Sequence, residues 1–160
     1  MPTEKSVTLA NFLYVAGHSR YGSTDGSAYG FVLRDETGQP LRQGSRYLAG
    51  QSYTAANYRA LIAGLEAAYE FGISRLVVRT RSRALVEQMI GTRPVSARML
   101  RPLARRAWFL SETASSIVYD LIAVEDDLAA PLADDAFASG PLVNGPPLRS
   151  GSEGANGRTG

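Results

Sequence analysis

The sequence predicts an α/β domain in which helices flank a mixed sheet. Residues 54–90 read as helix, strand and helix with short connections, and such a helix between strands joins a parallel pair. Residues 28–35 and 41–48 alternate as two strands on either side of an Asp-Glu-Thr-Gly turn, which is typical of an antiparallel hairpin. These two segments together predict both kinds of strand pairing in one sheet.

The composition fits one globular domain and excludes several other classes of protein. With 160 residues, of which 44% are apolar, the chain is large enough to form a hydrophobic core. It has no cysteine, which excludes disulfides and thiolate metal sites. No apolar run approaches the ~20 residues of a membrane helix, and the first residues lack the pattern of a secretory signal. We therefore expect a cytoplasmic protein without a membrane partner.

The first half of the chain supplies three strands and two helices. A first strand is expected at Leu9–Val15, followed by a loop from Gly17 onward. In the helix over 54–71, apolar side chains recur at three- and four-residue spacing and should face the core. This apolar stripe consists of Tyr58, Leu61, Ile62, Leu65, Ala68 and Tyr69. A buried strand follows at Leu76–Val78, and Ser82 is expected to cap the next helix.

The second half supplies two more helices, one strand and a tail. A helix is expected over Val95–Leu110, with Pro102 at a local start or kink. Its inward residues are predicted to be Met99, Leu103, Ala107 and Leu110, and its largely outward residues Arg98, Arg101, Arg105 and Arg106. Ile117–Val124 should form a fifth strand, and Leu128–Ala138 a closing helix that Pro131 breaks early. The composition then becomes rich in Gly, Pro and Ser, which predicts a domain over 1–138 and a flexible tail over 139–160.

Several of these segments resemble the type 1 ribonuclease H family. YRALIAGLEAAYEFGISRLVVR resembles the central segment of the family, and FLYVAGHSR with SAYGFVLRDETGQPL resembles its first strand, glycine loop and hairpin. VSARMLRPLARRAWFL resembles its later helix, and IVYDLIAVEDDLAAPLADDAFA its last strand and closing helix. The resemblance covers roughly residues 8–138 in the family's order. It implies a five-stranded sheet with strands 1–3 antiparallel and strands 1, 4 and 5 parallel.

The resemblance also implies a site where carboxylates hold two Mg²⁺ or Mn²⁺ ions, and this chain departs from it. Ala16 stands where the family has an Asp in a pattern like YVDGASR, and Asn57 where it has the Glu of NNVAEYRAL. Arg81 stands at the Asp of GDSQLV, and only Asp134 corresponds to the last carboxylate. Mg²⁺ prefers oxygen ligands with negative charge, so we expect no metal, no cofactor and no catalytic residue. The chain then resembles an inactive pseudo-nuclease in which Arg81 replaces the metal and pairs with Asp134.

An active RNA/DNA-hybrid ribonuclease remains the alternative, and it would need carboxylates from other positions. The candidates are Asp25, Glu66, Asp134 and Asp135. Asp25 lies in turn sequence, and Glu66 lies nine residues after Asn57, about half a turn around the helix. His18, the only histidine, is expected in an exposed loop, with a role as ligand or general base as the alternative.

The arginines suggest where a partner binds, although the net charge is only +2. Arg79, Arg81 and Arg83 alternate after the fourth strand and are expected to share one side. Arg98, Arg101 and Arg105 form a basic helical face that suits phosphate, although a solvated face paired with acids is the simpler interpretation. The sequence leaves open whether the partner is a nucleic acid or a protein, and which oligomeric state the protein adopts.

Overall fold

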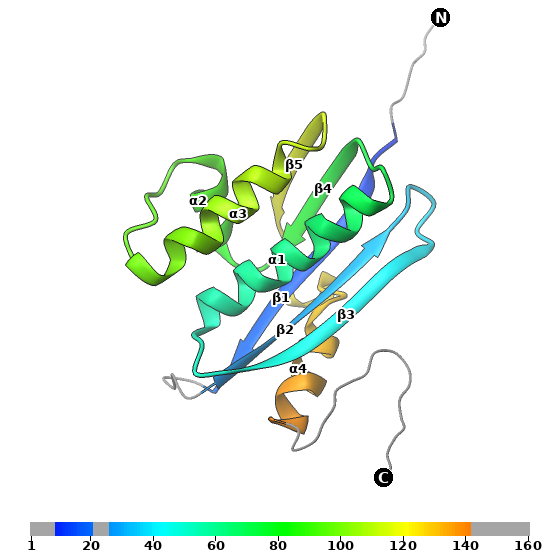
Figure 1. The fold of residues 1–160 in the computed structure, drawn as a ribbon. Coiled ribbons are helices and arrows are strands. Elements are labelled where there is room, and N and C mark those ends of the chain that lie inside the picture. Colours follow the sequence, from blue (N-terminus) through cyan, green and yellow to red (C-terminus); the bar gives the residue numbers. More distant parts are fainter. Residues whose placement is uncertain (1–8, 21–25, 142–160) are drawn as a thin grey trace, which may run out of the picture.

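The computed structural model describes residues 9–20 and 26–141, and within them the expected mixed sheet is confirmed. Its strands are β1 (Asn11–Ser19), β2 (Gly26–Arg34), β3 (Pro40–Ala49), β4 (Arg75–Thr80) and β5 (Ser116–Leu121). They lie in the order β3-β2-β1-β4-β5, in which β1, β2 and β3 pair antiparallel and β1, β4 and β5 pair parallel (Figure 1). Strand β4 therefore ends at Thr80 beside Val15 of β1, which runs on to Ser19.

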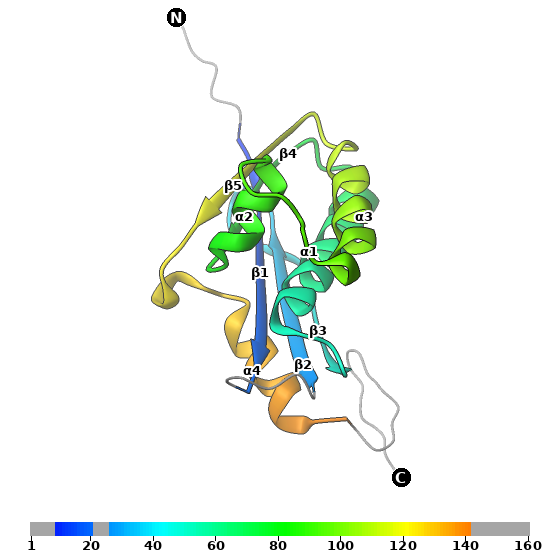
Figure 2. The same ribbon diagram turned by 90° about the vertical axis from the view of Figure 1, so that its left-hand side faces the viewer.

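Helices cover both faces of this sheet. They are α1 (Tyr53–Glu70), α2 (Arg83–Ile90), α3 (Arg101–Ser111) and α4 (Ala130–Ser139), with short 3-10 turns η2 (Arg98–Leu100) and η3 (Val124–Asp126). Figure 2 shows α1 and α3 on one side of the sheet and α4 on the other. Ser82 caps α2 as expected, because its Oγ accepts the backbone N–H of Leu85 at 3.1 Å. Within the described residues, no helix has the length and apolar character needed to span a membrane.

Alternate side chains of β1 supply the two cores. Leu13 and Val15 pack in the larger cluster with α1, whereas Tyr14 and Ala16 belong to a smaller cluster with α4. In the smaller cluster, α4 lies close to the sheet because small residues line both sides of this contact. A Cβ added to Gly30 would lie 2.8 Å from backbone atoms of α4. Helix α4 thus rests almost directly on the sheet next to the ends of the central strands.

Two predicted strand boundaries differ in the structure. Strand β1 does not end at Val15 but continues to Ser19. The reason is that β2 pairs with it along this stretch, where Ala28 is the partner of His18 and Ser27 is the partner of Ser19. The fifth strand ends at Leu121 and gives way to η3 rather than running to Val124. The expected loop after Gly17 is therefore part of the central strand, and His18 lies within the sheet.

The two prolines start helices rather than interrupt them. Pro102 and Pro131 lie in the first turns of α3 and α4, where their missing N–H groups cost nothing. The prediction that Met99 and Tyr69 point inward is wrong, since they are 83% and 63% exposed. The closing helix ends at Ser139, one residue later than predicted, and residues 142–160 of the predicted tail lie outside the described residues.

Alkaline pH is expected to weaken the core at Tyr58. Its side chain is fully buried and its hydroxyl donates to Oε1 of Gln88 at 2.7 Å. Burial raises the pKa of Tyr58 to about 12. Because this pKa lies above the value near 10 of the unfolded chain, the stabilisation is complete below about pH 10 and is lost as the pH rises through about 12.

Denaturant melts between pH 9 and 12, compared with Tyr58→Phe, measure this contribution. The wild type should lose up to about 3 kcal/mol more than the variant over this window. Parallel loss in both proteins would contradict the assignment. Tyr119→Phe is the matched comparison. Burial also raises the pKa of Tyr119, and the nearby Tyr58 raises it further.

Candidate functional site

The positions at which carboxylates are missing lie together where β4 ends beside β1, and we call this place the strand ends. In the parallel ladder Val15 pairs with Thr80, which places Ala16 and Arg81 next on neighbouring strands. Asn57 reaches the same place from α1. Its Cγ would lie only 3.2 Å from a Cβ added to Gly17, the residue after Ala16. The fold therefore brings these three positions to one place on the sheet.

Two of these residues offer no anionic oxygen. Ala16 is 4% exposed and packs in the cluster that contains Ala129 and Ala133 of α4. Asn57 is 1% exposed, and its Nδ2 donates to the backbone oxygen of Tyr53 at 3.1 Å. Both side chains are thus committed to packing or to a neutral hydrogen bond.

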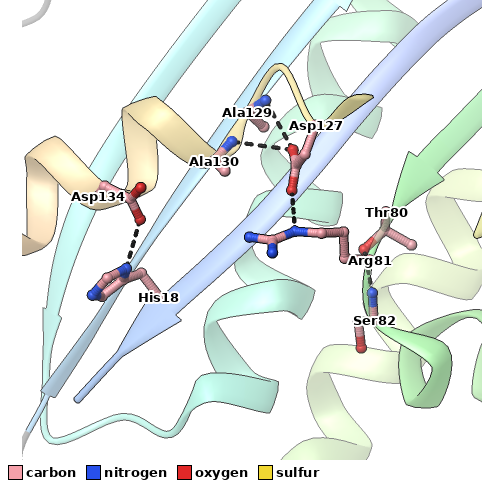
Figure 3. Close-up of polar contacts among 8 residues, drawn as sticks. All are labelled: His18, Thr80, Arg81, Ser82, Asp127, Ala129, Ala130 and Asp134. Carbon is pink, nitrogen blue, oxygen red and sulfur yellow. Dashed lines mark hydrogen bonds and ion pairs between the residues drawn. The ribbon is translucent and has the colours of Figure 1, made fainter. Parts of the chain in front are cut away.

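Arg81 makes the central polar contact of the site, with Asp127. Its Nε donates to Oδ2 of Asp127 at 2.8 Å (Figure 3). The other carboxylate oxygen of Asp127 accepts the backbone N–H groups of Ala129 and Ala130 at 3.0 and 3.1 Å. The Asp127 side chain is 1% exposed, so the pair is shielded from water on the acidic side. The guanidinium consequently ties the end of β4 to the start of α4.

The predicted pairing of Arg81 with Asp134 is therefore wrong. Asp134 instead lies 2.6 Å from Nδ1 of His18, and Figure 3 shows the two contacts as separate. The ring of His18 also packs against Phe137, with 4.5 Å between centroids. Because the side chains of His18 and Asp134 are 35% and 56% exposed, we expect this pair to contribute at most about 1 kcal/mol.

Sequence reasoning missed Asp127 for a local reason. Asp127 precedes the free N–H groups at the start of a helix, where Asp side chains commonly accept hydrogen bonds. The sequence pattern predicted that the closing helix begins at Leu128, whereas α4 begins at Ala130, and it assigned no role to Asp127. Its spacing of two and three residues before Ala129 and Ala130 was the signal that could have identified it.

The three alternating arginines do not form one cluster. Arg79 lies on the α4 side of the sheet, where its NH1 donates to the hydroxyl of Tyr14 at 2.9 Å. Its guanidinium carbon is 4.4 Å from the centroid of Phe12. Arg83 instead belongs to α2 and lies 4.0 Å from Glu87 of the same helix. Only Arg81 of the three contacts Asp127.

The predicted basic face lies on the outer side of α3, away from the strand ends. Arg98, Arg101 and Arg105 are exposed there. Neighbouring Arg106 pairs with Glu66 of α1 at 3.2 Å. Glu66 therefore faces α3, as expected from its position opposite Asn57 on α1.

The fold and the order of its elements can be compared with known proteins. A family model described as reverse transcriptase-like matches residues 15–133. The chain belongs to this ribonuclease H-like family. A comparison with curated proteins found no match to the sequence.

Solved ribonuclease H domains are similar over nearly their whole length. The N-terminal RNase H domain of a Mycobacterium tuberculosis protein is 28% identical, with a TM-score of 0.78, covering 82% of this chain and 96% of that one. RNase H1 from the archaeon Halobacterium salinarum is 27% identical, with a TM-score of 0.75 and coverage of 82% and 99%. LC11-RNase H1, in complex with an RNA/DNA hybrid, is 27% identical, with a TM-score of 0.74 and coverage of 81% and 97%.

The residues of this ribonuclease H-like domain do not fit a pair of divalent metal ions. In residues 9–20 and 26–141, no group of three or more His, Asp or Glu side chains is placed to hold a metal. The alternative carboxylates are dispersed: Glu66 faces Arg106, Asp134 faces His18, and Asp135 is exposed on α4. Asp25 lies outside the described residues. At the strand ends the donor set contains a methyl group, an amide and a fixed cation, which is unsuited to hard divalent ions.

Proposed function

We propose that this ribonuclease H-like domain binds nucleic acid without hydrolysing it. The ion pair between Arg81 and the buried Asp127 carries the proposal, because it puts a permanent cation at the end of β4. Hydrolysis of this class relies on two divalent ions that activate water and stabilise the leaving oxygen. A unit charge repels another by ~4 kcal/mol at ~4 Å and an effective dielectric of 20, and a divalent ion by more. A metal ion beside Arg81 is therefore strongly disfavoured.

The unused part of the Arg81 guanidinium supports a nucleic-acid partner. Only its Nε contacts Asp127, and its terminal nitrogens have no hydrogen-bond partner among the described residues. The side chain is 37% exposed, so these nitrogens remain accessible. A guanidinium fork fits phosphate oxygens. The hybrid bound by LC11-RNase H1 supplies the ligand class to test first.

A labelled RNA/DNA hybrid tests binding and cleavage on one preparation. We expect no cleavage with Mg²⁺ or Mn²⁺, and binding that is the same in EDTA and falls steeply with salt, as phosphate contacts require. Metal-dependent cleavage would establish the active alternative with carboxylates from other positions. Absence of hybrid binding at low salt would reject the proposed nucleic-acid function and favour a protein partner.

Two arginine variants locate the contact. Arg81→Lys keeps the positive charge but loses the fork, and should weaken hybrid binding if a phosphate is held by the terminal nitrogens. Arg83→Gln removes a charge two residues along the chain and is the matched control, since Arg83 is directed to Glu87. If Arg81→Lys binds the hybrid like the wild type while Arg83→Gln weakens binding, only the overall charge matters and the proposed phosphate contact is rejected.

A further inference from the structure

The outer face of α3 carries cations and an aromatic ring in one line. At about 100° per residue, Arg101, Arg105 and Trp108 project within about 60° of each other, and all three are exposed. Arg98 precedes them in η2 and is also exposed. We call these four residues the α3 stripe. Helix α3 packs on α1 and α2, so the stripe is separate from the strand ends that carry Arg81 (Figure 1).

The positive charge of the α3 stripe is not balanced by acids. Arg98 and Arg105 have no ion pair or hydrogen bond within the part of the chain that the structure describes. Arg101 donates only to the backbone oxygens of Val95 and Ser96, at 3.3 and 3.4 Å, which orients it without neutralising it. The sequence favoured a solvated face whose arginines pair with acids. Within the described residues, no such pairs form at these three arginines. An anionic partner complements them.

The apolar side chains beside these arginines indicate which kind of anionic partner fits this surface. Trp108 is 40% exposed although it is the largest side chain in the chain, and Phe109 is 62% exposed. Met99, expected in the core, is 83% exposed next to Arg98. A single nucleic-acid strand offers both phosphates and free base faces, and proteins bind such strands with cationic grooves and aromatic platforms. In a duplex the base faces are already stacked and are not available to an exposed indole.

We propose that the α3 stripe binds a single strand of nucleic acid, with phosphates at Arg98 and Arg105 and a base stacked on Trp108. Arg101 holds the segment before η2 in position and adds positive charge. This surface is a second nucleic-acid contact, and it does not depend on the hybrid binding proposed for the site at Arg81. A single strand held there needs no metal ion.

The sequence contains one tryptophan, so its fluorescence reports on this surface alone. We expect oligo(dT) or oligo(U) to quench Trp108 saturably, and added salt to reverse the quenching. Each phosphate contact on a single strand contributes about −0.7 to the slope of log K against log salt. Arg98→Gln with Arg105→Gln should therefore weaken binding and reduce the slope by about 1.4. Arg75→Gln is the control, because Arg75 is exposed on β4 and has no acidic partner among the described residues.

The stacking contribution is measured with a labelled oligonucleotide instead. Trp108→Ala should lower its affinity about tenfold, and Trp108→Phe should retain part of the affinity because a ring remains. Melting curves of each variant show whether the fold is intact, and the arginine pair leaves the core untouched. The inference is overturned if no oligonucleotide quenches Trp108, or if the double variant behaves like Arg75→Gln.

Two further outcomes separate this inference from other possibilities. An acidic peptide of equal charge that competes as well as the oligonucleotide would overturn it in favour of an acidic protein partner. Arg81→Lys should leave the quenching of Trp108 unchanged while it weakens hybrid binding. Loss of hybrid binding with intact quenching would therefore reject only the function proposed for the strand ends, and the reverse result would reject only the α3 stripe.

Discussion

Replacing Asp127 with alanine is expected to lower the free energy of unfolding by about 3–5 kcal/mol. The substitution removes the acceptor of three hydrogen bonds, from Nε of Arg81 and from the backbone N–H groups of Ala129 and Ala130. It leaves the guanidinium without its counter-ion and the start of α4 without a cap. Urea denaturation followed by circular dichroism measures the change.

Asp134→Ala is the matched control, because it removes an acid from the same region of the fold. Its contact with His18 is exposed, so its loss should cost at most about 1 kcal/mol. Asp127→Asn keeps the volume and one acceptor oxygen but loses the charge, and should lie between the two. If Asp127→Ala and Asp134→Ala were equally mild, the contact of Arg81 with Asp127 would not hold α4 in place.

Replacing Arg81 with aspartate is expected to make stability depend on divalent metal. The variant puts a second carboxylate opposite the buried Asp127, and the two negative charges repel. In EDTA we expect a loss of several kcal/mol, since a buried ion pair becomes a like-charged pair. Mn²⁺ or Mg²⁺ should restore part of this loss, because carboxylate oxygens are their preferred ligands. The wild type should melt at the same temperature with and without metal.

Arg81→Gln separates loss of the cation from gain of an acid. It should be destabilised as well, because Asp127 again loses its counter-ion, but its melting temperature should not respond to Mn²⁺. Arg81→Asp should still not cleave a hybrid, since Ala16 and Asn57 supply no carboxylates. A metal response equal in Arg81→Asp and wild type would contradict the idea that Arg81 stands where a metal would otherwise bind.

Local patterns were enough to predict most of the fold. The spacing of apolar residues in α1, the turn after β2 and the cap at Ser82 each depend on residues within a few positions of one another. The absence of carboxylates at positions 16, 57 and 81 is likewise a property of the chain alone. The predicted parallel pairing of the first and fourth strands, which the register of Val15 with Thr80 confirms, brings positions 16 and 81 next to each other.

The partner of each charged side chain was decided only by the tertiary structure. The extension of β1 to Ser19 depends on β2, which brings His18 to Asp134 across more than a hundred residues of sequence. The start of α4 at Ala130 then gives Arg81 to Asp127. A pattern of single residues predicts which face of an element is buried, but an ion pair depends on the relative placement of two elements to within an ångström or so. That placement is set by packing, here by the close contact of α4 with Gly30 and Ala16, which the sequence does not encode locally.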